Sequence, residues 1–235
     1  MFEGWFSADE VSAITLSIKV ALASAVVTLP PAIAFGFLLA RKNFPGKSLL
    51  DGILCLPLVM PPVTTGYLLL LALGRRSFIG HFCEEYLGIR MSFTLLGAII
   101  ASMVVSFPLV LRAVRISFEM VHPKYEDAAG TLGAPRWNVF LYITLPLALP
   151  GIINSFLLGF ARSLGEFGAT ITFAGNISGE TRTIPLAVYT LMQIPGEEAA
   201  SMRLVMISVI ISLIAMVGSE LLNRRMKRRL GGERN

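Results

Sequence analysis

Five long apolar segments alternate with shorter polar stretches along the chain. They cover residues 11–40, 49–74, 93–114, 147–173 and 204–222. A helix needs about 20 predominantly apolar residues to cross the hydrocarbon core of a bilayer, so each segment is long enough to span it. The first two are longer than necessary, which predicts that they tilt or break. We therefore expect an all-α membrane protein with about five transmembrane helices.

The composition agrees with insertion into a membrane. Hydrophobic residues make up 54% of the 235 residues and charged residues only 15%, whereas a soluble domain carries about a quarter charged residues. The polar connections are too short to hide a soluble domain, so residues 1–235 are expected to form a single membrane domain. The alternating ten-residue segments of a transmembrane β-barrel are absent from the sequence.

The positions of the basic residues predict the orientation, because cytoplasmic loops carry an excess of Lys and Arg. Most of them lie in three stretches, residues 41–47, residues 112–136 and the tail from Arg224 to Arg234. We expect these stretches in the cytoplasm, which puts the N-terminus outside and the C-terminus inside. A cytoplasmic N-terminus would require a sixth crossing, and residues 184–194 are the remaining apolar stretch that could provide it.

Proline residues lie within several of the apolar segments. Pro30 and Pro31 lie in the first segment, Pro57, Pro61 and Pro62 in the second, and Pro108 in the third. Each proline removes a backbone donor and bends or breaks a helix. These prolines either serve helix packing alone or mark broken helices that line a transport pathway.

The polar stretch between the third and fourth segments predicts a short helix. Pro123 suits the first helical turn, and Gly133 suits the position just past the helix end. Between them, Tyr125, Ala128, Ala129 and Leu132 recur at the spacing of one helix face. This face is too small to anchor the helix in lipid, so a groove on a partner protein is the natural receiver. The alternative is a surface helix tucked under the bundle.

The same stretch resembles the signature of permeases of ABC importers. That signature has E-A-A, three residues, Gly, nine residues and I-x-L-P, and this chain has Asp127-Ala-Ala129, Gly133, Ile143, Leu145 and Pro146 at those positions. Asp127 stands where the family usually has Glu, although Glu126 precedes it. The resemblance implies that residues 122–146 form a coupling segment that docks in a groove of a cytoplasmic ATPase. Its candidate coupling residues are Glu126, Asp127, Ala128, Ala129, Gly133, Ile143, Leu145 and Pro146.

Other stretches resemble molybdate permeases over nearly the whole length, among them residues 41–47, 56–62, 161–169 and 176–185. The resemblance implies an inner-membrane permease for an oxyanion, with the compact helical core of small importers. The implied assembly is a homodimer with two ATPase subunits and an extracytoplasmic molybdate-binding protein. Tungstate and sulfate remain open as substrates. The sequence has no phosphate-binding loop, so ATP and Mg are expected in the partner ATPase and no cofactor in this chain.

Two charged residues, Arg162 and Glu166, lie within the fourth apolar segment. Charges inside a membrane are costly, and residues four apart on one helix can pair. The pair either fixes helix packing, or Arg162 faces the pathway and attracts an anion while Glu166 sets its orientation.

The same segment carries a row of small residues at four-residue spacing: Gly151, Ser155, Gly159 and Ser163. Such rows allow close approach of helices, so these residues are candidates for a helix interface or for the pathway. Five helices are few to enclose a pathway, which favours a dimer with the pathway at its two-fold axis.

Two other classes of membrane protein are weaker interpretations. A secondary transporter would couple to an ion gradient through membrane carboxylates, of which Glu166 is the one strong candidate, and such folds usually have more spans and inverted repeats. A membrane enzyme would need a nucleophile with a base or a metal cluster. Cys55, Cys83, His81 and His122 lack the spacing of metal ligands, and the basic tail lacks the aromatic residues expected of a nucleic-acid site.

Overall fold

The computed structural model describes residues 6–230, with side chains described as far as residue 221. The side chains of the basic tail, on which part of the orientation prediction rests, lie outside this range. The elements are α1 (Ala8–Arg41), α2 (Lys47–Val59), α3 (Pro62–Leu73), α4 (Phe78–Leu87), α5 (Leu95–Glu119), α6 (Pro123–Thr131), α7 (Arg136–Val139), the π-helix η1 (Phe140–Thr144), α8 (Leu145–Leu164), α9 (Gly168–Phe173), α10 (Ile184–Leu191) and α11 (Glu198–Leu230).

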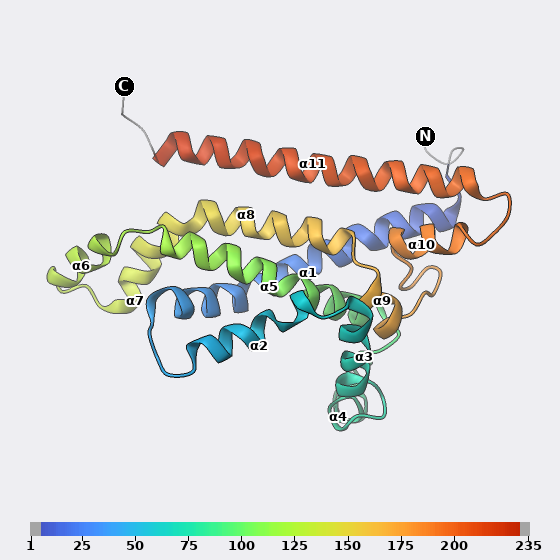
Figure 1. Cartoon of the computed structure of the whole chain (residues 1–235), viewed down its shortest axis with the longest axis horizontal. Coiled ribbons are helices and arrows are strands. Elements are labelled where there is room, and N and C mark those ends of the chain that lie inside the picture. Colours follow the sequence, from blue (N-terminus) through green and yellow to red (C-terminus); the bar gives the residue numbers. More distant parts are fainter. Residues whose placement is uncertain (1–5, 231–235) are drawn as a thin grey trace.

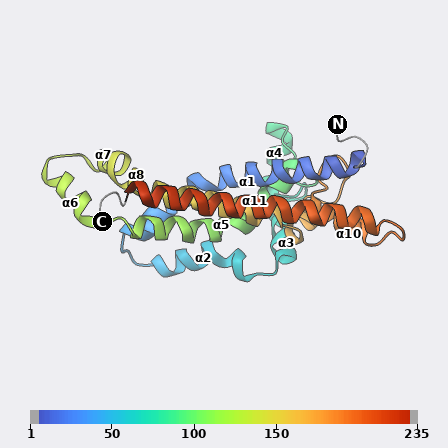
Figure 2. The ribbon, with the colours of Figure 1, turned by 90° about the horizontal axis from the view of Figure 1, so that it is seen from above.

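Four long helices, α1, α5, α8 and α11, run along the long axis of the molecule (Figures 1 and 2). Helices α6 and α7 lie at one end of this bundle, which we call the α6 end, together with the last turns of α11. The start of α1 and helix α10 lie at the opposite end, which we call the α10 end. Helices α2, α3 and α4 lie on the side of the bundle opposite α11 (Figure 1).

Within residues 6–230, four helical stretches are long and apolar enough to cross a membrane. They are Ala8–Arg41, Leu95–Glu119, Arg136–Leu164 and Glu198–Leu221, and the bent pair α2–α3 can provide a fifth crossing. These findings confirm the prediction of an all-α membrane protein with about five spans. Helix α10 has 8 residues, fewer than the ~20 that a crossing needs.

The second predicted segment is broken, as its length and its prolines suggested. Helix α2 ends at Val59, α3 begins at Pro62, and the two axes are bent by 114°. Pro61 and Pro62 explain the position of the break, because proline lacks the N–H group and disfavours helical geometry in the residue before it. Pro30 and Pro31, in contrast, lie inside an uninterrupted α1.

The fourth predicted segment, 147–173, is wrong at its end. Helix α8 stops at Leu164, and a short link leads to the separate helix α9. The backbone N–H of Ala169 donates to Oε1 of Glu166 at 3.0 Å, so the Glu166 side chain caps the start of α9. Hydropathy missed this break because its average over the whole segment stays apolar, and Gly165 and Gly168 were the available signal.

The α2–α3 break and the α8–α9 break lie against each other. A Cβ at Gly66 of α3 would lie 2.7 Å from the carbonyl oxygen of Ala169, and one at Gly168 would lie 2.8 Å from Cβ of Pro62. Backbone therefore meets backbone between α3 and α9, with no space for a side chain. Ala169 and Phe173 of α9 complete this contact in a buried cluster with Ala101 and Val105 of α5.

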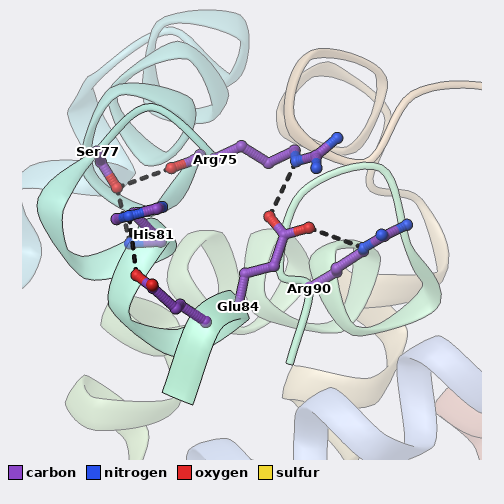
Figure 3. A network of polar contacts seen from close by, with 8 residues as sticks. Arg75, Ser77, His81, Glu84 and Arg90 are labelled. Atoms are coloured by element: carbon purple, nitrogen blue, oxygen red, sulfur yellow. Dashed lines mark hydrogen bonds and ion pairs between the residues drawn. The ribbon is translucent and has the colours of Figure 1, made fainter. Parts of the chain in front are cut away.

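Helix α4 and its flanking loops form a lobe at the end of α3. Glu84 lies between Arg75 and Arg90, with 2.9 Å to each guanidinium (Figure 3). Partial desolvation of the Glu84 carboxylate raises its pKa, but hydrogen bonds and charges from Arg75 and Arg90 outweigh this, so its pKa lies below the ordinary value. The three residues tie the chain entering α4 to the chain leaving it.

We expect a methyl group at position 66 to destabilise the protein. In Gly66→Ala the new Cβ meets the backbone of α9, which cannot move without separating α3 from α9. Overpacking of this kind costs about 1–3 kcal/mol, so the midpoint of thermal unfolding in detergent should fall by several degrees. Gly52→Ala in α2 is the control, because its Cβ meets nothing within 4 Å. Equal midpoints for both variants would contradict the close contact of α3 and α9.

Candidate functional site

Helix α6 lies in the polar stretch for which the sequence predicted a short helix, and it begins at Pro123 as predicted. Pro123 is the first helical residue, and Nδ1 of His122 accepts a hydrogen bond from the N–H of Lys124 at 3.2 Å. The helix lies beyond the ends of the long helices (Figure 1). Most of its residues are exposed, so its outer side is accessible to a partner, although Ala129 is buried against the rest of the chain.

The end of α6 depends on Gly133, which has a φ of +80°. The N–H of Gly133 donates to the carbonyl of Gly130 at 3.0 Å, and the N–H of Ala134 donates to the carbonyl of Ala129 at 3.1 Å. These two bonds form a Schellman motif, which needs a left-handed residue at this position. A Cβ at Gly133 would meet nothing within 4 Å, so the requirement for glycine comes from φ and not from space.

The apolar face predicted for α6 is divided between the bundle and the solvent. Ala129 is buried, whereas Tyr125 is exposed and Leu132 is 88% exposed. Trp137 of α7 and Tyr142 of η1 are exposed as well. Large apolar side chains in this number at the tip of a bundle indicate an interaction surface.

Glu126 and Asp127, which the sequence analysis grouped together, point to different surroundings. Oε1 of Glu126 accepts hydrogen bonds from Nε of Arg41 at 3.0 Å and from Oγ1 of Thr144 at 2.9 Å. Asp127 is exposed and has no hydrogen bond or ion pair with any residue whose side chain is described. Glu126 therefore faces its own chain, and Asp127 is available to a partner.

The remaining signature residues lie where η1 passes into α8. Ile143 is the fourth residue of η1, Leu145 starts α8 and packs on the core, and Pro146 follows it. Since Pro146 lacks an N–H group and would clash with the carbonyl four residues earlier, the helix widens here, and the N–H of Leu145 donates to Phe140. Sequence analysis missed this π-helix, and Pro146 inside a helical stretch was the available signal.

Arg162 and Glu166 form the predicted ion pair, with 2.9 Å between Nη1 and Oε2. They do not share a helix, because Arg162 is in the last turn of α8 and Glu166 follows its end. The Glu166 side chain is 2% exposed and the Arg162 side chain 32%. The pair therefore consists of a buried carboxylate, held in place at the break, and a guanidinium that is partly open.

The row of small residues on α8 packs inside the single chain. A Cβ at Gly151 would overlap Ser117, and one at Gly159 would lie 2.7 Å from Cγ2 of Val110, so both glycines face α5. Ser155 is buried and donates to the Gly151 carbonyl at 2.7 Å. Ser163 accepts a hydrogen bond from Ser24 of α1 at 2.9 Å. The row thus forms an interface of α8 with α5 and α1, and it gives no argument for contact between two subunits.

We expect the two halves of the Arg162–Glu166 pair to differ in their effect on stability. Arg162→Gln leaves a buried carboxylate without its counter-charge, and breaking a buried pair costs about 3–5 kcal/mol. Glu166→Gln keeps an oxygen that can accept from Ala169 and leaves a guanidinium that is partly open. Thermal unfolding in detergent should therefore rank Arg162→Gln below Glu166→Gln, with the double variant close to Glu166→Gln. The reverse order would contradict the role of Glu166 as the buried partner.

Comparison with known proteins agrees with this geometry. The family model described as "Binding-protein-dependent transport system inner membrane component" matches residues 32–228. The molybdenum transport system permease protein of Haemophilus influenzae is 55% identical over 222 residues, which cover 94% of this chain and 97% of the relative. The sulfate transport system permease protein CysT of Escherichia coli is 36% identical and covers 91% of this chain and 78% of its own length.

Solved structures of low sequence identity share the fold. A bacterial alginate ABC transporter matches 94% of this chain and 81% of its own chain, with a TM-score of 0.74 at 16% identity. The MetNI methionine ABC transporter matches 94% of this chain and 99% of its own, with a TM-score of 0.66 at 15% identity. From the family match and the close relatives, the chain belongs to the inner membrane components of binding-protein-dependent transport systems.

Proposed function

We propose that the chain is the membrane-spanning permease subunit of an ATP-driven importer for molybdate. The observation that carries this proposal is the similarity to molybdenum permeases of Haemophilus influenzae and Escherichia coli, at 54–55% identity over 94% of the chain. The sulfate permease is less similar, at 36%. Tungstate has the same tetrahedral dianionic form as molybdate, and the choice between them is assigned to the binding protein.

In this proposal α6 is the coupling helix that docks on the ATPase. Its exposed Tyr125 and Leu132 suit an apolar groove, and the exposed carboxylate of Asp127 suits a basic group at the rim. The ATPase subunits bind ATP and Mg, and this chain supplies the contact that receives their movement. The α6 end is then the cytoplasmic end, which agrees with the clustering of Arg41, Lys42 and Lys47 near it.

The proposed assembly is a homodimer with two ATPase subunits at the α6 end and a molybdate-binding protein at the α10 end. Four or five spans in one chain are few to enclose a pathway for a hydrated dianion. A pathway between two copies solves this problem, because each copy contributes one wall. Arg162, with its partly open guanidinium next to the meeting point of two broken helices, is our candidate for attracting the anion.

Uptake into vesicles tests the function. The chain is reconstituted with its ATPase and its binding protein, and molybdate uptake is measured with and without ATP. We expect uptake that requires ATP and the binding protein, is abolished by vanadate, and is competed by tungstate more strongly than by sulfate. Uptake driven by an ion gradient without ATP would contradict the proposal and favour a secondary transporter.

A pair of glycine substitutions tests the coupling role of α6. Gly133→Ala forces a side chain into left-handed geometry at a cost of about 1–2 kcal/mol, which unravels the end of α6, so molybdate uptake per ATP hydrolysed should fall. Gly130→Ala is the matched control, since its Cβ also meets nothing within 4 Å but its φ is ordinary. Wild-type uptake per ATP in Gly133→Ala would argue against docking through this helix.

A further inference from the structure

A compact polar cluster joins α6 to the rest of the chain. It consists of Arg41 at the end of α1, Glu126 in α6, Thr144 in η1 and the backbone carbonyl of Val121, and we call it the Glu126 clamp. Arg41 donates to Oε1 of Glu126 from Nε at 3.0 Å, and its Nη2 lies 2.9 Å from the same oxygen. Nη2 also donates to the Val121 carbonyl at 2.7 Å, and Thr144 donates to Glu126 at 2.9 Å.

The clamp differs from an ordinary surface ion pair in its burial and in the number of bonds. The side chains of Arg41 and Glu126 are 13% and 22% exposed, and Thr144 is buried. Charge-assisted hydrogen bonds of this kind are stronger than neutral ones, and several bonds on one carboxylate fix its direction. The Glu126 carboxylate therefore connects α6 to both α1 and η1.

The covalent links of α6 are irregular segments. Residues 120–122 connect it to α5, and residues 132–135 connect it to α7. The clamp connects α6 to a third element, the end of the 34-residue helix α1. The clamp therefore gives α6 a direct side-chain connection to α1, in addition to its covalent connection to α5.

Helix α1 is also fixed at the α10 end. Glu10, which is buried, pairs with Arg203 of α11 at 3.0 Å, and Oγ of Ser17 accepts a hydrogen bond from the N–H of Ile184 in α10 at 2.6 Å. Glu10 and Arg203 also line a cavity of about 340 Å³ together with residues of α10. A shift of α1 along its axis would move this end as well.

We propose that Glu126 is a positioning residue that transmits the displacement of α6 to α1, while the neighbouring Asp127 faces the ATPase. Helix α1 then carries the movement across the membrane as a rigid element to its contacts with α10 and α11. This inference rests on the proposed function, because it assumes that an ATPase moves α6. It assigns different contacts to two adjacent carboxylates: Asp127 contacts the ATPase, and Glu126 contacts α1 and η1 of its own chain.

The test uses the complete transporter in proteoliposomes, with ATP hydrolysis and molybdate uptake measured on the same sample. Arg41→Met, Glu126→Gln and Thr144→Val each weaken the clamp, and Thr144→Ser retains its hydroxyl group. Glu119→Gln is the matched control, because Glu119 pairs with Arg115 on α5 outside the clamp. The Arg41→Met, Glu126→Gln double variant shows whether the two residues act through each other.

We expect Arg41→Met and Glu126→Gln to bind and hydrolyse ATP with their partner ATPase while uptake per ATP falls about tenfold, the effect of losing one charge-assisted bond. The double variant should be no worse than either single variant. Thr144→Val should lower the ratio less, and Thr144→Ser and Glu119→Gln should keep the wild-type ratio.

Three outcomes would overturn the inference. If Arg41→Met and Glu126→Gln keep the wild-type uptake per ATP while Gly133→Ala is uncoupled, the clamp does not transmit the movement. The coupling role of α6 would then still stand. Loss of ATPase binding in Glu126→Gln but not in Arg41→Met or Thr144→Val would make Glu126 a docking residue. Absence of ATP-dependent uptake in the wild type would remove the proposed function and the clamp together.

Discussion

Backbone hydrogen bonding in a medium without water is the constraint on which this fold depends. A helix that stops inside a membrane must satisfy its free backbone groups within the protein. Two helix breaks within the predicted apolar segments, at Pro61–Pro62 and at Gly165–Phe167, pack against each other. The carboxylate of Glu166 accepts a hydrogen bond from the N–H of Ala169, one of these backbone groups. Helix α5 covers one side of this contact, where Ala101 and Val105 pack on Ala169 and Phe173.

The same need for hydrogen-bond partners applies to three buried or partly buried carboxylates. Glu10, Glu126 and Glu166 each pair with an arginine and each accept a second bond from a neutral donor, which is the Ser7 N–H, the Thr144 hydroxyl and the Ala169 N–H respectively. A carboxylate removed from water needs several donors to offset its desolvation. All three residues lie at the first turn or just before the start of a helix. Buried charge in this protein therefore fixes where helices begin and how they meet.

Much of this structure follows from the sequence, because hydropathy indicates which segments are long enough to span a membrane. Glycine and proline indicate where helices begin and end. The spans, the break in the second segment, and the limits of α6 at Pro123 and Gly133 were predictable for these reasons. The break after Leu164 was not predicted from hydropathy, because the segment as a whole averages as apolar despite Arg162 and Glu166. The opposite directions of Glu126 and Asp127 were also hidden, since they depend on Arg41, 85 positions away in the chain. Spacing predicts a coupling segment, but only the tertiary structure shows that Glu126 faces the chain itself and that Asp127 is exposed.

The contact of α3 with α9 has a consequence for the way such a protein can be altered. At Gly66 and Gly168 the backbones of α3 and α9 are in contact without a side chain between them. The two helices therefore form one rigid unit, although they come from different hydrophobic segments. A larger residue at either glycine would push α3 and α9 apart. A library designed to change the selectivity of the transporter would therefore hold both glycines constant. It would diversify a partly open position at the break, such as Met60, where new side chains can be accommodated without separating the two backbones.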